Sequence, residues 1–275
     1  MMMNSLLLLS VLVVGCSAFK IKQDAPFAFN DTANIIGGRK ANLNEFPYQV
    51  GFRKKGQSST FCGGSIISDE WMISAGHCFD GRTGNIEDIE AVIGSLDVKN
   101  PGKVVGKLTA KVHPDFGDQN RHPDITLIHV SGGGLVTKGG DWITAAVKLN
   151  DDPKRKLAGS TATVSGYGAI NEVTQEQSRY IKTTNVEIQK DEVCSDLYKK
   201  SDFDPETSDM CVGDMSGDSG ACFGDSGGPL VIGKGSERVQ VGVVSRGYSC
   251  ARRNTPKIYA HVAHLMSWIK EVTGL

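Results

Sequence analysis

The stretch that decides the fold is Gly224-Asp225-Ser226-Gly227-Gly228-Pro229-Leu230, late in a chain of 275 residues. Glycines on both sides of Ser226 allow the backbone to turn tightly and to expose the serine hydroxyl. The same turn aims the main-chain N–H groups of Gly224 and Ser226 at one point, where they would stabilise an oxyanion. A serine hydroxyl is a weak nucleophile on its own, so it needs a neighbouring base that a third group holds in place.

Two earlier segments carry candidates for the base and for the group that holds it. One is Ser74-Ala75-Gly76-His77-Cys78, and the other is Asp124-Ile125-Thr126-Leu127-Ile128. In each segment the polar residue lies at the edge of an apolar stretch, as a positioned catalytic group would. We therefore predict that His77, Asp124 and Ser226 act together. A second copy of the serine motif, Gly217-Asp218-Ser219-Gly220, lacks the following Gly-Pro-Leu and is interpreted as a loop.

The composition is that of an ordinary globular protein, with 39% hydrophobic and 22% charged residues and a formal charge of −1. These values exclude bulk disorder and the strong basic field of a nucleic-acid-binding protein. Short apolar runs separated by turn residues predict an all-β barrel or sandwich. The clearest runs are Tyr48–Phe52, Thr161–Val164, Pro229–Ile232 and Val239–Val244. Only His261–Val272 has the spacing of a helix, with Gly274 beyond it.

The N-terminal residues predict secretion. Leu6–Val14 is an apolar run, and Cys16-Ser17-Ala18 provides the small residues of a signal-peptidase site, so we assign residues 1–18 to a signal peptide. No Lys or Arg precedes the run, and a buried N-terminal strand is the alternative. Residues 19–34 are interpreted as a propeptide, with a glycosylation sequon at Asn30-Asp31-Thr32. No later segment approaches the ~20 apolar residues of a membrane span.

The cysteine count fits a secreted protein. Of seven cysteines, Cys16 would leave with the signal peptide. An even set in a secreted chain predicts three disulfides, although spacing alone allows fifteen pairings. Zinc binding is the alternative, but the chain has no CxxC or HExxH spacing, and we expect no metal and no cofactor. The six cysteines that would remain after Cys16 is removed are Cys62, Cys78, Cys194, Cys211, Cys222 and Cys250.

From Ile35 to the C-terminus, these motifs resemble the trypsin/chymotrypsin family of serine proteases. Ile35-Ile36-Gly37-Gly38 is similar to the N-terminus that this family exposes on activation. Cys62-Gly63-Gly64-Ser65 through His77-Cys78 is similar to the histidine loop of the family. Ser245-Arg246-Gly247 partly matches the strand that binds the substrate backbone.

The resemblance implies an all-β fold of two six-stranded antiparallel barrels with a C-terminal helix. The barrels would span approximately residues 35–140 and 141–260 of a protease domain at 35–275. His77 and Asp124 would come from the first barrel and Ser226 from the second. The resemblance also implies three pairs of cysteines, Cys62–Cys78, Cys194–Cys211 and Cys222–Cys250.

The activity implied is that of a secreted, monomeric serine endopeptidase made as a zymogen and acting on proteins or peptides. The new ammonium of Ile35 would fold onto Asp225 and lock the oxyanion loop. Asn34 precedes Ile35, where trypsin-activated relatives carry Arg or Lys. We therefore expect an asparaginyl-specific activator or self-cleavage. The alternative is a protease-like binding or regulatory protein without activity.

The resemblance places Gly220 at the base of the primary specificity pocket, with Ala221 next to it. Because the aspartate of trypsin-like enzymes is absent there, specificity for Lys or Arg is not expected. Lys257 replaces a glycine that normally lines the pocket, and its ammonium would favour an acidic side chain. Alternatively, Lys257 reaches solvent or pairs with Asp218 and leaves a small neutral pocket.

Three arginines near the expected cleft would add positive potential. Arg246 stands where the family customarily has Trp, between Ser245 and Gly247 of the substrate-binding strand. Arg252 and Arg253 follow closely.

Overall fold

The computed structural model describes residues 35–81, 84–117, 122–137, 139, 143–199 and 202–275. The predicted signal peptide, the predicted propeptide and the sequon at Asn30 lie outside these residues. None of the helices in the described ranges is both long and apolar enough to span a bilayer.

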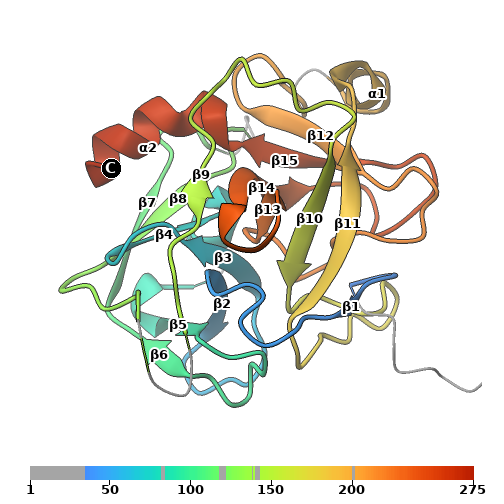
Figure 1. The fold of residues 1–275 in the computed structure, drawn as a ribbon. Coiled ribbons are helices and arrows are strands. Elements are labelled where there is room, and N and C mark those ends of the chain that lie inside the picture. The colour runs from blue at the N-terminus through green and yellow to red at the C-terminus, as the bar shows by residue number, and fades with distance from the viewer. Residues whose placement is uncertain (1–34, 82–83, 118–121, 138, 140–142, 200–201) are drawn as a thin grey trace, which may run out of the picture. The chain divides into compact units, whose positions relative to one another are not determined.

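The first sheet is built from strands in the N-terminal half of the chain (Figure 1). All of its pairings are antiparallel, and between the described residues β6 and β7 do not pair, so this sheet is curled and not closed. Its order is β6 (Lys103–Val105), β5 (Ile89–Ile93), β2 (Gln49–Lys54), β3 (Cys62–Ile66), β4 (Trp71–Ser74), β8 (Thr126–Val130) and β7 (Leu108–Val112).

The second sheet closes into a six-stranded barrel, because β11 pairs with both β10 and β12. Around the barrel the order is β10 (Thr161–Gly166), β13 (Pro229–Ile232), β14 (Val239–Arg246), β15 (Lys257–His261), β12 (Asp209–Gly213) and β11 (Lys182–Ile188). Two short strands extend this sheet: β1 (Arg39–Lys40) pairs with β11, and β9 (Lys148–Leu149) runs parallel to β14. The all-β prediction is confirmed, and the expected pair of barrels is refined to one closed barrel and one half-barrel.

The described helices are few and short. The predicted C-terminal helix is present as α2 (Met266–Thr273), and it ends at Gly274 in a left-handed conformation. It begins later than the spacing suggested, because His261 is the last residue of β15 and Val262–Leu265 form a 3-10 turn, η4. The sequence did not predict α1 (Asp191–Leu197). The other 3-10 turns are η1 (Gly76–Cys78), η2 (Ile86–Asp88) and η3 (Gly235–Glu237).

Two large apolar clusters form the core. One fills the first sheet around Phe52, Ile66 and Ile73, and it continues into Val231 and Val243 of the barrel. The other fills the barrel interior, and it includes the fully buried Ile35. The cysteine pairs implied by the family resemblance are all present: Cys62–Cys78, Cys194–Cys211 and Cys222–Cys250.

The register of the first sheet explains how two distant candidate residues meet. β4 and β8 are neighbours, with Ser74 opposite Thr126. His77 follows the end of β4 in η1, and Asp124 directly precedes Ile125 and β8. Two residues that flank paired strand ends in this way must lie close together, although they are 47 positions apart in the sequence.

Candidate active site

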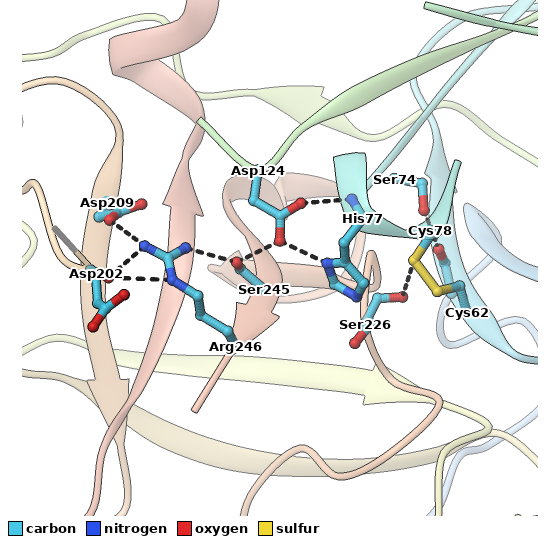
Figure 2. Close-up of polar contacts among 11 residues, drawn as sticks. Cys62, Ser74, His77, Cys78, Asp124, Asp202, Asp209, Ser226, Ser245 and Arg246 are labelled. Carbon is cyan, nitrogen blue, oxygen red and sulfur yellow. Dashed lines mark hydrogen bonds and ion pairs between the residues drawn. A yellow bond between two sulfur atoms is a disulfide. The ribbon is translucent and has the colours of Figure 1, made fainter. Parts of the chain in front are cut away.

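The Asp124 carboxylate is buried and accepts three hydrogen bonds (Figure 2). Its Oδ2 lies 2.7 Å from His77 Nδ1, and its Oδ1 accepts the His77 main-chain N–H at 2.9 Å. The Ser245 hydroxyl donates to the same Oδ2 at 2.6 Å. These contacts orient the imidazole so that Nδ1 carries the proton toward Asp124, and Nε2 remains the basic nitrogen.

The two charged forms of this pair stabilise each other. Burial opposes the charge of Asp124, but His77 and Ser245 outweigh it, so the pKa of Asp124 lies below its usual range. Burial also lowers the pKa of His77, but the Asp124 carboxylate more than compensates and the net shift is upward. The site is therefore built to hold an imidazolium when His77 takes up a proton.

Ser226 lies beside the His77 segment (Figure 2). Its main-chain carbonyl accepts a hydrogen bond from Gly63 at 2.7 Å and lies 3.8 Å from the sulfur of Cys78, the residue after His77. Within the part of the chain that the structure describes, its hydroxyl has no hydrogen-bond partner. The hydrogen bond between a nucleophile and its base is often long in a substrate-free enzyme, and it tightens when substrate binds.

Within Gly224–Gly228, two main-chain N–H groups donate no hydrogen bond to the described residues. Asp225, Gly227 and Gly228 each donate their N–H to a main-chain carbonyl, whereas Gly224 and Ser226 donate to no acceptor among the described residues. Gly224 has a φ of 89°, which L side chains rarely adopt. The two predicted oxyanion donors therefore both remain available to a ligand.

Asp225 is fully buried behind this loop. Its carboxylate accepts the N–H of Gly168 at 2.8 Å and of Cys222 at 2.9 Å. Burial raises its pKa to about 6, although these hydrogen bonds and the charge of Lys257 oppose the rise. Glycines make the room it needs, because a Cβ at Gly168 would lie 2.3 Å from its carboxyl carbon.

Lys257 is held against the predicted substrate-binding strand. A Cβ at Gly247 would lie only 2.7 Å from its Cγ, so the lysine stem passes over that glycine. Burial lowers the pKa of Lys257 to about 8, and the carboxylates of Asp225 and Glu172 oppose this effect. Its ammonium has no ion pair with Asp218 or with any other described residue.

Gly220 places no side chain at the base of the expected pocket. A Cβ at Gly220 would have its nearest neighbour 3.9 Å away, at Ala251, and the adjacent Ala221 is buried. Glu172, which no sequence motif marks, borders this region: its carboxylate accepts the Cys250 N–H at 3.1 Å and lies 3.3 Å from Arg252. Nothing local could have revealed this contact, because 78 residues separate Glu172 from Cys250.

Arg246 does not present a free charge to the expected cleft. Its guanidinium binds the Asp209 carboxylate at 2.7 Å and the main-chain carbonyl of Asp202 at 2.5 Å (Figure 2). It also donates to the Ser245 hydroxyl at 3.0 Å. Arg253 is exposed.

One group in the described ranges has the spacing of metal ligands, formed by Cys62, His77 and Cys78. The two sulfur atoms are bonded to each other, so neither is a thiolate that would bind zinc. This group therefore belongs to the His77 loop and its disulfide.

Comparison with known proteins gives a consistent result. The sequence model of the family described as Trypsin matches residues 35–269. Trypsin 5G1 of Aedes aegypti is 32% identical over 250 residues, which cover 90% of this chain and 88% of that protein. Trypsin of Sus scrofa is 30% identical over 250 residues, which cover 89% of this chain and 98% of that protein.

Proposed function

Because this chain belongs to the trypsin/chymotrypsin-like family of serine proteases, we propose that it is a secreted endopeptidase that hydrolyses peptide bonds through an acyl-enzyme on Ser226. The observation that carries the proposal is the hydrogen-bonded chain from Ser245 through Asp124 to His77, with Ser226 beside it. It supplies a base, a group that orients the base and a nucleophile.

In the proposed reaction, His77 Nε2 takes the proton of the Ser226 hydroxyl as its oxygen attacks the scissile carbonyl carbon. The carbonyl oxygen becomes an oxyanion and accepts hydrogen bonds from the N–H groups of Gly224 and Ser226. His77 then donates its proton to the leaving amine, and the C–N bond breaks. His77 then takes a proton from water as the water oxygen attacks the acyl carbon, and it returns that proton to the Ser226 oxygen when the bond between that oxygen and the acyl carbon breaks. Asp124 orients the imidazole and stabilises its cationic form throughout.

We propose that the chain is made as a precursor with a signal peptide at 1–18 and a propeptide at 19–34. Cleavage after Asn34, by an asparaginyl-specific protease or by the enzyme itself, would free the Ile35 ammonium. Two features support this site: Ile35 is fully buried in the barrel core, and its φ of 42° is strained for a β-branched residue. A new N-terminus would relieve that strain, and its charge would pair with the buried Asp225 carboxylate.

We further propose that the pocket beside Gly220 prefers an acidic residue before the scissile bond. The support is a largely buried Lys257 ammonium that is not neutralised by an ion pair within the described residues. A buried cation of this kind gains most from an anionic ligand. Gly220 contributes no side chain that would block this position.

Covalent labelling tests the proposed activity against the alternative of an inactive binding protein. A sulfonyl fluoride should label the cleaved protein on Ser226, and peptide cleavage should stop as the label is incorporated. Ser226→Ala is the matched control and should take up no label. A cleaved, folded protein that is neither labelled nor able to hydrolyse any peptide or ester would refute the proposal.

A further inference from the structure

Arg246 links the candidate triad to a second buried carboxylate. The contacts run from Asp209 to Arg246 at 2.7 Å, from Arg246 to the Ser245 hydroxyl at 3.0 Å, and from that hydroxyl to Asp124 at 2.6 Å. Figure 2 shows these side chains in one continuous line that ends at His77. The side chain of Arg246 is 14% exposed and that of Asp209 is 0% exposed, so the ion pair is shielded from water.

A local irregularity in the barrel produces this arrangement. Neighbouring side chains of a regular strand point to opposite faces of the sheet. The pairing of β14 with β15 shifts register between Val244 and Arg246, so Ser245 has no partner in the ladder. A bulge of this kind redirects the side chains around it. Here it lets Ser245 reach Asp124 while Arg246 reaches back to the Ser245 hydroxyl.

The hydrogen-bonding capacity of these groups fixes the direction of each contact. A guanidinium only donates hydrogen bonds, and it stays charged at any working pH. Because Arg246 donates to the Ser245 oxygen, the single hydroxyl proton of Ser245 is left for Asp124 Oδ2. A hydroxyl without this donor would be free to rotate its proton away from the carboxylate.

We propose that Arg246 is a positioning residue of the catalytic triad, which holds the Ser245 hydroxyl as a donor to Asp124, and that Asp209 holds Arg246 in place. The inference rests on the proposed serine protease activity. Arg246 would act on the reaction through Ser245 and Asp124, and it would not touch the substrate.

The charge of Arg246 also reaches His77. Burial and the charge of Arg246 lower the pKa of His77, whereas Asp124 and Asp80 raise it. Burial raises the pKa of Asp209 above the usual range. The charge of Arg246, the hydrogen bond from the Asp204 N–H and the nearby His122 act in the opposite direction but do not outweigh burial. Removing the Arg246–Asp209 pair should therefore raise the pKa of His77.

The test is the double variant Arg246→Met/Asp209→Asn, which removes both charges and leaves neither unpaired. In the cleaved enzyme we expect kcat to fall ~3- to 10-fold, the scale of one hydrogen bond, with KM little changed. The acid limb of the pH profile of kcat/KM should move upward by about half a unit, on the scale expected for one screened charge. Arg246→Lys keeps the charge and should keep the midpoint of that limb near that of the parent.

A distant ion pair supplies the control. Arg53 and Glu90 form a pair at 2.7 Å between β2 and β5, with side chains that are 12% and 14% exposed. Arg53→Met/Glu90→Gln should lower thermal stability without moving the pH profile. The proposal would be overturned if the Arg246→Met/Asp209→Asn enzyme had the kcat of the parent and the same midpoint of the acid limb. It would also be overturned if both double variants shifted that midpoint equally.

A second measurement does not depend on activity. In a Ser226→Ala background, the pKa of His77 can be followed by NMR through its ring protons. It should rise when the Arg246–Asp209 pair is removed and stay constant when the Arg53–Glu90 pair is removed. A parent protein without activity, whose His77 still responds in this way, would refute the proposed function and leave the positioning role supported.

Discussion

Among single residues, Lys257 should decide which substrates are cut. Replacing it with Ala removes the charge that would meet an acidic side chain, so cleavage after Glu or Asp should fall. A charge-assisted hydrogen bond predicts a loss of about 10- to 100-fold in kcat/KM. A peptide library varied before the scissile bond measures this effect, with the exposed Lys55→Ala as control. Unchanged cleavage after Glu and Asp would leave the neutral-pocket alternative.

The pH dependence of this preference provides a separate prediction for the same residue. The pKa of Lys257 is lowered to about 8, so its charge is present below that pH and lost above it. Cleavage of Glu substrates, measured as kcat/KM, should therefore decline as the pH rises through about 8. Substrates with a neutral residue at the same position should show no such decline, and parallel profiles for both would contradict the role of Lys257.

Local motifs indicated which residues form the candidate site, but they indicated fewer of the contacts between those residues. The meeting of His77 with Asp124 was expected from two motifs in the family resemblance, and the structure joins them at 2.7 Å. The partners of Arg246 could not be expected, because Asp209 lies 37 residues away and the contact depends on a register shift in β14. A motif describes residues that are neighbours in the sequence, whereas the two residues of a buried ion pair are brought together by the packing of separate strands.

At the level of the elements, the segment after β10 must remain free of side chains beside Asp225. Gly168→Ala would place a methyl group 2.3 to 2.5 Å from the carboxylate and force it to move. Overpacking of this kind costs about 1–3 kcal/mol. We expect the midpoint of thermal unfolding to fall by ~5 °C and Ser226 labelling to weaken.

A matched glycine provides the control for this substitution. A Cβ at Gly106 would meet no atom within 4 Å, so Gly106→Ala should leave both stability and labelling unchanged. Equal behaviour of Gly168→Ala and Gly106→Ala would show that the space beside Asp225 is not needed.

Strands were easier to predict than helices in this chain. The run Pro229–Ile232 corresponds to β13, because a short apolar run between turn residues has little alternative in an all-β fold. The seven-residue helix α1 was missed because helices this short are marginal on their own. It is stabilised by its surroundings, including the disulfide from Cys194 to Cys211 on β12.

For the molecule as a whole, the residue before Ile35 should control activation. Trypsin should not release Ile35 from the natural precursor, because Asn34 offers it no basic side chain. Asn34→Arg should make the precursor cleavable by trypsin and yield the same mature N-terminus. N-terminal sequencing after trypsin treatment checks both forms. Clean release of Ile35 from the unchanged precursor would rule out an asparaginyl-specific requirement.

The placement of the disulfides determines whether two fragments separate after the backbone is cut once. Cys62–Cys78 joins β3 of the first sheet to η1, and the other two bridges of the described residues lie within the half that forms the barrel. Between the halves, the described residues are held by non-covalent contacts, which include the packing of Val231 and Val243 against the first cluster and the hydrogen bond from Ser245 to Asp124. A single nick between residues 131 and 160 would thus yield two fragments that urea alone separates, each keeping its own bridges, with no reducing agent needed.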